Sequence, residues 1–344
     1  MEFFKYFFTR MIVVGIFLLI ANQLYKATYW KKDVGNHSDS LESFWELPAN
    51  TENIYFGESS NFHVVDPKKG RHSISIMLDS LLKDKKIGTV DKPGLHAGTY
   101  LAVLKNIPEE MPLKMIIVTM NLRSFDADWR NSVGENYLAK TKRLIAPNLP
   151  IVNRFLIALK DYDYKTDEQR HDQLIETWKK EKFYIPNFKY NDVIKWDSAM
   201  AWHTWLGKNP NLTEENIGLA CHYIKNFAFK IDPKTNQRIK DFDEIVEIAK
   251  KRHIKIVFNL LAENMEEANK LVGKELIYLM ENNRKFLINR YHRNGNLVVD
   301  NLYAIQDNHF VDRNWPTEHY TRAGKLIIAK NIQKVLISKG ISKK

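Results

Sequence analysis

The stretch KMIIVTMN at residues 114–121 is a nearly continuous apolar run. A second run of the same kind, IKIVFNLLAE, occupies residues 254–263. Short apolar runs like these are typical of strands that are buried on both faces of a parallel sheet. We therefore predict two such strands, and the rest of the chain is interpreted around them.

The segments on either side alternate between strand and helix patterns. Short strands are predicted at 53–57 and 296–301, and apolar residues at helical spacing predict helices over 73–84, 99–107, 269–291 and 321–338. Alternation of strands and helices indicates an α/β fold with a mainly parallel sheet.

One stretch interrupts this alternation. About 130 residues separate the two apolar runs, whereas a plain crossover between parallel strands needs roughly a third of that length. We predict that residues 135–250 form a mostly helical insertion that caps a site. Its tryptophans, which would suit sugar rings if exposed and otherwise form the insertion's own core, are Trp178, Trp196, Trp202 and Trp205.

Composition excludes several classes of protein. The 344 residues include one cysteine, Cys221, so neither an internal disulfide framework nor a zinc site of several cysteines is available. The net charge of +11 suits an anionic partner, but no nucleic-acid motif accompanies it, and we predict no nucleic-acid partner. HExxH, GxGxxG and GxxxxGK[ST] are all missing from the sequence, so we predict no metal and no cofactor.

The N-terminus carries the apolar run MIVVGIFLLIA at residues 11–21. Apolar residues extend it to 3–25 if Lys5 and Arg10 snorkel, which approaches the roughly 20 residues that a membrane span needs. A cleaved signal peptide is one alternative, but it requires a small-x-small cleavage site, and the following residues NQLYKATYW contain none. A buried core helix is the other alternative. We predict an uncleaved signal anchor over residues 1–30, in the membrane through residues 3–25, followed by a polar tether over 31–52.

The orientation of this anchor is not decided by counting charges. Lys5 and Arg10 precede the apolar run at 11–21, and Lys26, Lys31 and Lys32 follow it. An N-terminal anchor before a large soluble domain usually holds that domain outside the cytoplasm. We therefore expect a single-pass membrane protein whose C-terminal domain lies in the periplasm or at the cell surface.

Residues suited to acyl transfer follow the predicted strands. In open α/β sheets the reactive groups lie at the carboxyl ends of the strands. GESSN (57–61), LHAGT (95–99), Asn121 and PTEHY (316–320) occupy such ends or the loops beside them. Acyl transfer needs a serine hydroxyl to attack a carbonyl carbon, a histidine to take its proton, and N–H donors to hold the oxyanion.

The order and context of these segments resemble the SGNH hydrolase superfamily, also called GDSL-type esterases, over residues 53–125 and 253–335. The resemblance implies a three-layer α/β/α, flavodoxin-like domain over residues 53–340. It implies Ser59 as nucleophile and His319 as base. It also implies an oxyanion hole made by Ser59, Gly98 and Asn121, with Gly94 as the alternative glycine.

The chain departs from the family pattern in ways that leave the orienting acid open. Pro316 stands where the family often has an aspartate three residues before its histidine, and Glu58 replaces the aspartate of the first block. Asp312, on the same loop, is the first candidate for the third catalytic residue; Glu318 or a Ser–His dyad are alternatives. The alternative to catalytic roles is that these residues have structural roles alone. Ser59 would then cap a helix, Asn121 would form part of a turn, and His319 would be a surface histidine.

Together these features predict a membrane-anchored, extracytoplasmic serine esterase or O-acyltransferase. The resemblance implies an acyl-Ser59 intermediate, an acylated cell-surface polysaccharide or other ester as substrate, and a membrane-bound acyltransferase as partner. The alternative is a non-catalytic glycan-binding or assembly protein on the same fold. A binder of nucleic acid or lipid surfaces that exploits the positive charge is the third hypothesis.

Overall fold

The centre of the molecule is a five-stranded parallel sheet. The computed structural model describes residues 2–63, 72–163, 165–209 and 212–343. The strands are β1 (Asn53–Gly57), β2 (Gly88–Asp91), β3 (Met115–Met120), β4 (Lys255–Leu260) and β5 (Leu297–Asp300). Their order is β2-β1-β3-β4-β5 and every pair is parallel, which is the flavodoxin-like order. The predicted α/β class is confirmed, although β2 was not expected, because this short edge strand has no apolar run.

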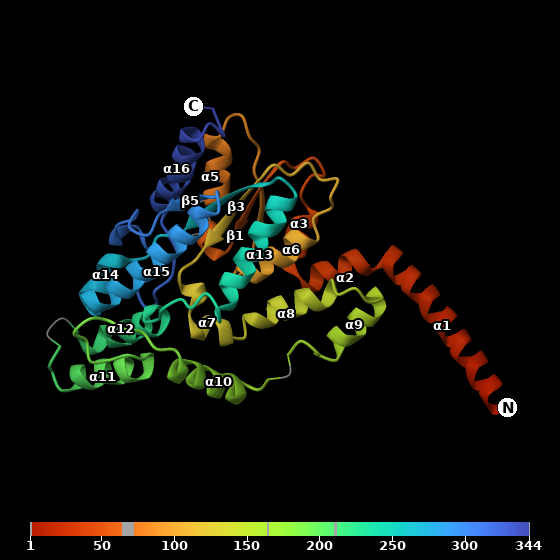
Figure 1. Cartoon of the computed structure of the whole chain (residues 1–344), viewed down its shortest axis with the longest axis horizontal. Helices are drawn as coiled ribbons and strands as arrows, with labels where there is room; N and C mark the ends of the chain where they lie inside the picture. The colour runs from red at the N-terminus through yellow and green to blue at the C-terminus, as the bar shows by residue number, and fades with distance from the viewer. Residues whose placement is uncertain (1, 64–71, 164, 210–211, 344) are drawn as a thin grey trace.

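Helices cover both faces of the sheet (Figure 1). On one face lie α5 (Ile74–Leu81) and α16 (Arg322–Ser338), packed against Ile117 and Val257. On the other lie α6 (Ala97–Lys105), α13 (Gln237–Lys251) and α15 (Lys274–Arg293), packed against Val118 and Phe258. Successive strand residues point to opposite faces, so a strand between two helical layers must be apolar throughout. The three layers follow directly from this requirement.

A row of helices connects β3 to β4. Figure 1 shows most of this row along the lower side of the molecule, beneath the sheet. Its members are α7 (Ala127–Asn131), α8 (Glu135–Leu144), α9 (Pro150–Ala158), α10 (Asp167–Lys180), α11 (Val193–Trp205) and α12 (Glu214–Phe227). The next helix, α13, is different, because Phe242 and Ile245 pack it onto the sheet as the crossover helix. The expected insertion over 135–250 therefore contains one helix of the central domain.

The four tryptophans expected in the insertion divide into two pairs. Trp178 and Trp196 are buried and form part of the core, which was the alternative to binding sugar rings. Trp202 and Trp205, on α11, are 56% and 72% exposed. The remaining short helices, α4 (Ser59–Phe62) and α14 (Met265–Leu271), follow β1 and β4.

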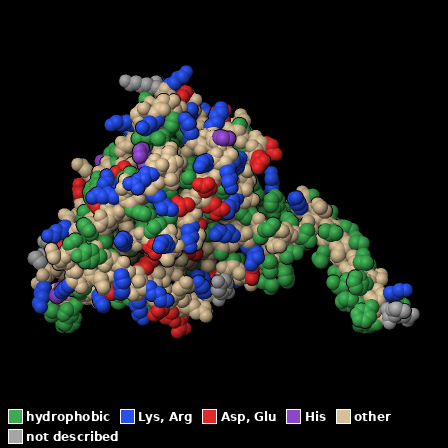
Figure 2. Space-filling model, in the orientation of Figure 1, with side chains coloured by type: hydrophobic (Ala, Val, Ile, Leu, Met, Phe, Trp, Pro, Cys, Tyr) green, Lys and Arg blue, Asp and Glu red, His purple; other side chains and the backbone are tan. Residues whose placement is uncertain are grey.

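The N-terminal helix α1 (Glu2–Thr28) projects away from the folded domain (Figures 1 and 2). Phe3–Thr28 is long and apolar enough to cross a membrane, and Figure 2 shows hydrophobic side chains along the projecting arm. The most apolar part of this helix is exposed, so α1 is not a buried core helix of this domain.

The polar tether expected over 31–52 is corrected by the structure. Residues 30–45 instead form α2 (Trp30–His37) and α3 (Asp39–Trp45). Val34, Leu41 and Phe44 are buried in the main core. Their burial outweighs the polar composition of the segment, because each buried apolar side chain contributes roughly 1.5–3 kcal/mol.

Candidate active site

The turn after β1 places Ser59 at the carboxyl edge of the sheet. Gly57 ends the strand, Glu58 caps the next helix by accepting a hydrogen bond from the Ser60 N–H (3.2 Å), and Ser59 begins α4. A Cβ on Gly57 would lie 2.9 Å from the Tyr55 ring, closer than real Cβ atoms approach, and 3.1 Å from Asn61 Cβ, which is also a tight contact. The turn is therefore tight enough to require glycine.

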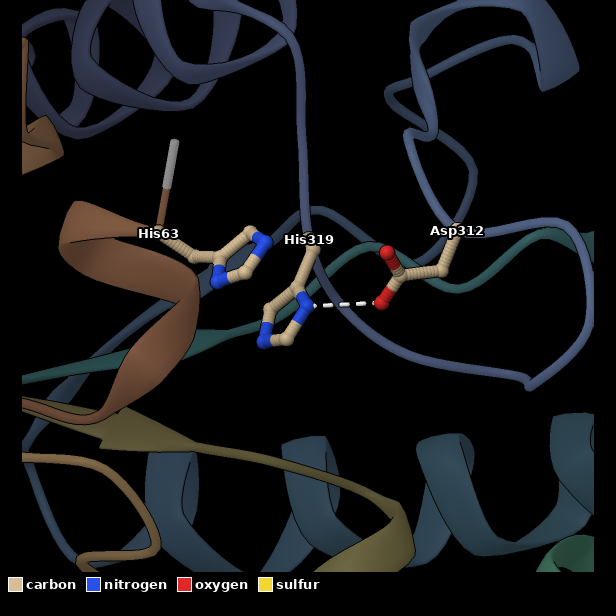
Figure 3. A group of neighbouring side chains, drawn as sticks. All are labelled: His63, Asp312 and His319. Atoms are coloured by element: carbon tan, nitrogen blue, oxygen red, sulfur yellow. Dashed lines mark hydrogen bonds and ion pairs between the residues drawn. The ribbon is translucent and has the colours of Figure 1, made fainter. Parts of the chain in front are cut away.

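Ser59, His319 and Asp312 form a continuous hydrogen-bonded chain. His319 Nε2 lies 2.9 Å from Ser59 Oγ, although the two residues are 260 positions apart. His319 Nδ1 lies 2.7 Å from Asp312 Oδ2, as the dashed line in Figure 3 marks. Asp312 Oδ2 also accepts a hydrogen bond from the Thr317 hydroxyl. This is the hydroxyl–imidazole–carboxylate sequence of a serine-hydrolase triad.

The surroundings of the hydrogen-bonded Ser59, His319 and Asp312 favour a neutral imidazole on His319 beside an ionised carboxylate on Asp312. Burial and the neighbouring His63 lower the pKa of His319, against the opposing influence of Glu318 and Asp312. Burial alone would raise the pKa of Asp312, but hydrogen bonds from Thr317 and His319 lower it below its ordinary value. His319 is therefore unprotonated at neutral pH and able to accept a proton from Ser59.

His63 stacks directly on His319 (Figure 3). The two ring centroids are 3.9 Å apart and the planes differ by 10°. His63 follows α4, where its backbone N–H donates to the Ser59 carbonyl (2.8 Å) and its own carbonyl accepts from the buried Lys325 amine. The sequence analysis did not assign His63 to the site; the signal for it is the single helical turn that separates it from Ser59.

The same three side chains are the group of described residues best spaced to hold a metal. Ligand atoms of His63, Asp312 and His319 lie within 4.8 Å of one another. However, imidazole lone pairs lie in the ring plane, and the planes of these two stacked rings are nearly parallel. The two lone pairs cannot converge on one ion without a ring rotation, so this arrangement fits stacking and hydrogen bonding better than metal binding.

A buried charge cluster supports the loop that carries His319. Arg123 makes two hydrogen bonds to Glu318, from Nε to Oε1 at 3.0 Å and from Nη2 to Oε2 at 2.8 Å. Glu58 and Glu263 are each 2% exposed, and burial followed by repulsion from Glu318 raises the pKa of both carboxyls. Glu318 was an alternative orienting acid, but its carboxylate pairs with Arg123. Arg123 itself was missed by the sequence analysis, and its only signal is its position two residues after Asn121.

Ser59 Oγ has a second acceptor in this cluster. Glu58 Oε2 lies 2.9 Å from Ser59 Oγ, the same distance as His319 Nε2. A hydroxyl carries one hydrogen, so it donates to one of these two acceptors at a time. The protonation of Glu58, whose pKa is raised, therefore influences which partner receives the serine hydrogen.

The structure separates the candidate oxyanion donors. The Gly98 N–H already donates to His96 Nδ1 (3.2 Å), and a Cβ on Gly98 would meet Leu138 and Asp241 within the packed interior. Gly94, the alternative, lies in the loop after β2 with a φ of 72° and lines an open cavity. Asn121 follows β3 and is 6% exposed, and its Oδ1 has no hydrogen-bond partner among the described residues. The Gly98 N–H is therefore already engaged within the packed interior, whereas Gly94 borders a cavity.

A cavity of about 500 Å³ lies on the α8 side of the cluster. Gly94 and Arg123 line it, so it adjoins both the glycine candidate and the guanidinium that holds Glu318. The Arg123 guanidinium carbon lies 5.0 Å from the centre of the Trp129 ring, and Asp126 contributes a buried Oδ2 that has no partner among the described residues. Other lining residues include Ser38, Tyr137, Thr141, Asn226 and Trp315.

Comparison with known proteins by sequence finds no relative. No family model matches the chain, and no curated protein matches it.

Comparison with solved structures does find similar proteins, at low identity. A member of the lipolytic protein G-D-S-L family from Veillonella parvula is 9% identical, with a TM-score of 0.38, over 83% of this chain and 97% of its own. A lipase/acylhydrolase from Enterococcus faecalis is 8% identical, with a TM-score of 0.35, over 84% and 97% of the two chains. A carbohydrate acetylesterase family member from Sinorhizobium meliloti is 8% identical, with a TM-score of 0.34, over 84% and 98%. This chain is thus similar to solved GDSL-type proteins as well as carrying segments that resemble their motifs.

Proposed function

We propose that this protein is a membrane-anchored serine esterase or O-acyltransferase that works through an acyl-Ser59 intermediate. The observation that carries the proposal is the hydrogen-bonded chain from Asp312 through His319 to Ser59. Each member lies where its role requires, with Nε2 of the imidazole on the hydroxyl and Nδ1 on the carboxylate.

The reaction follows from this geometry. Ser59 Oγ attacks the carbonyl carbon of an ester while His319 Nε2 takes the hydroxyl proton. N–H donors from Ser59, Gly94 and Asn121 hold the oxyanion of the tetrahedral intermediate. His319 then protonates the departing alkoxide, which leaves an acyl group on Ser59. A water or an acceptor hydroxyl, deprotonated by His319, attacks this acyl group and frees the serine.

The adjoining cavity supports a hydroxyl-rich substrate. Trp129 and Trp315 contribute indole rings to its lining, and Asp126 and Asn226 contribute polar groups. Apolar walls with a few polar groups in fixed positions are typical of small-molecule sites, and this combination suits a sugar ring. We propose an acylated extracytoplasmic glycan as substrate or acceptor, and a membrane-bound acyltransferase as the partner that supplies acyl groups.

A non-catalytic glycan-binding protein is the second candidate. The observation that favours it is the hydrogen bond from Ser59 Oγ to Glu58 Oε2. A hydroxyl committed to this carboxylate would not be activated by His319, and the cavity would then serve binding alone.

A serine-reactive fluorophosphonate separates the two candidates. We expect the full-length protein in detergent to be labelled on Ser59, because only an activated serine attacks the phosphorus centre at a useful rate. Peptide mass spectrometry identifies the modified residue, and the Ser59→Ala variant serves as the unlabelled control. Wild-type protein that stays unmodified while remaining folded would favour the binding protein.

The Asp312→Asn variant tests the role of the third residue through pH dependence. We expect the acid limb of kcat/KM of the wild-type protein to lie below the ordinary imidazole pKa of about 6.5, because burial and His63 lower the pKa of His319. Asp312 acts in the opposite direction, so its neutralisation should move this limb to still lower pH and reduce kcat by about 10²- to 10⁴-fold.

Asp307→Asn is the matched control for this measurement. Asp307 lies five residues earlier on the same loop, and its carboxylate pairs with Arg313 and accepts a hydrogen bond from Asn264. The control should keep both kcat and the acid limb of the wild-type protein. An acid limb that moves upward in Asp312→Asn, or an unchanged kcat, would contradict the assigned role.

A further inference from the structure

Helix α9 presents an exposed apolar face. Val152, Phe155 and Leu159 are 37%, 62% and 62% exposed, and their spacing of three and four residues puts them on one side of the helix. Asn153 and Ile157 are buried on the opposite side. None of the residues that the structure describes therefore covers these exposed side chains.

The same helix is tied to the base of α1. The Ile151 N–H donates to Asn22 Oδ1 at 3.2 Å, and Arg154 Nε lies 2.6 Å from Asp33 Oδ2. Asp33 Oδ2 also accepts a hydrogen bond from the Tyr25 hydroxyl (2.7 Å). Figure 1 shows α9 next to the end of α1 at which the arm joins the folded domain. These contacts fix the height of α9 along the axis of α1.

That height coincides with the edge of a bilayer. An α-helix rises about 1.5 Å per residue, so the roughly 30 Å of hydrocarbon takes about 20 residues. Counted from Phe3, where the candidate span begins, the hydrocarbon ends near Asn22. The residue that α9 touches is thus at the boundary between acyl chains and headgroups.

We propose that α9 is a second membrane contact, with Val152, Phe155 and Leu159 inserted at the boundary between headgroups and acyl chains. The inference rests on the proposed membrane anchor α1. A lipid surface is the partner that fits, because the apolar face adjoins the span. Exposed lysines of the kind that contact anionic headgroups lie on α1, on α2 and directly after α9: Lys26, Lys31, Lys32 and Lys160.

The second contact has a consequence for the candidate active site. A domain held by one helix is free to rotate and tilt, whereas two contacts fix its orientation. The cavity that Arg123 borders is also lined by Ser38, Asp39 and Ser40 at the junction of α2 and α3, and by Tyr137 and Thr141 of α8. These elements pack between α1, α9 and the central domain, so docking of α9 holds the cavity at a constant distance from the membrane.

Site-directed fluorescence in the full-length protein tests this proposal. Single cysteines are introduced by Phe155→Cys, Phe17→Cys or Tyr184→Cys in a Cys221→Ser background, and each carries an environment-sensitive nitrobenzoxadiazole label. Phe17 lies within α1, and Tyr184 is a control that is 76% exposed and lies outside α1 and α9. The proteins are reconstituted into phosphatidylcholine/phosphatidylglycerol vesicles that contain nitroxide lipids.

We expect shallow nitroxides to quench the label at 155 at least about twofold more than the label at 184, and deep nitroxides to quench the label at 17. Equal quenching at 155 and 184, with strong quenching at 17, would overturn the docking of α9 and leave the anchor intact. A label at 17 that no lipid nitroxide quenches would overturn the anchor and with it the premise for α9. A melting temperature close to that of the wild-type protein in each variant checks that the fold survives.

Discussion

Replacement of Ser59 by alanine is expected to reduce ester hydrolysis by at least about 10³-fold, because the Ser59 hydroxyl is the group that lies against His319 Nε2 and supplies the attacking oxygen. Removal of a single hydroxyl leaves the Asp312–His319 hydrogen bond in place, so substrate binding should change little. The measurement is the release of p-nitrophenol from p-nitrophenyl acetate, together with the release of acetate from an O-acetylated polysaccharide.

Ser60→Ala is the matched control. Ser60 is the next residue of the same short helix, and its buried Oγ has no hydrogen-bond partner among the described residues. Loss of this hydroxyl should leave both activity and melting temperature close to those of the wild-type protein. Ester hydrolysis by Ser59→Ala at a rate close to that of Ser60→Ala and of the wild-type protein would refute an acyl-Ser59 intermediate.

Arg123→Met is expected to cause the largest loss of stability, about 3–5 kcal/mol. Arg123 and Glu318 are 7% and 1% exposed, so removal of the guanidinium leaves a buried carboxylate without its counter-charge. Glu58 and Glu263 are buried in the same cluster, where the charge of Glu318 raises their pKa values and the charge of Arg123 lowers them. Thermal unfolding of the full-length protein in detergent, followed by intrinsic fluorescence, measures the change.

The loss should depend on pH in a defined direction. The pKa values of Glu58 and Glu263 are raised in the folded protein, so the folded state holds protons that the unfolded chain releases above its ordinary carboxyl pKa near 4.3. Stability from these groups is therefore present at low pH and falls as the pH rises toward their folded pKa values. Arg123 lowers both values, so its removal should make this fall steeper, and Arg123→Met should be less destabilising at pH 5 than at pH 8.

Two variants act as controls for this prediction. Arg313→Met breaks the exposed pair with Asp307, in which the side chains are 50% and 36% exposed, and should cost no more than about 1 kcal/mol. The double variant Arg123→Met/Glu318→Leu removes both charges and should recover part of the stability that the single variant loses. Equal melting temperatures for Arg123→Met and Arg313→Met would contradict the assigned role of the cluster.

Local patterns in the sequence were sufficient for the central elements and for the ends of the candidate catalytic chain. The apolar runs at 114–121 and 254–263 became β3 and β4, because a strand between two helical layers must be apolar on both sides. Ser59 and His319 were identified from the residues that follow β1 and β5, since the carboxyl ends of parallel strands meet at one edge. The segment at 31–52 was misjudged, because three well-spaced apolar residues were hidden within a polar composition.

The amino-acid sequence by itself thus predicted the α/β fold, the apolar N-terminal helix, and the Ser59 hydroxyl and His319 imidazole. Each of these depends on patterns within a few residues. The choice among acids and donors depended on distances between segments far apart in sequence. Asp312 reaches His319 Nδ1 while Glu318 turns to Arg123, and Gly98 is already hydrogen-bonded while Gly94 faces the cavity. Neighbouring side chains compete for the same partners, and only tertiary packing decides which contact forms.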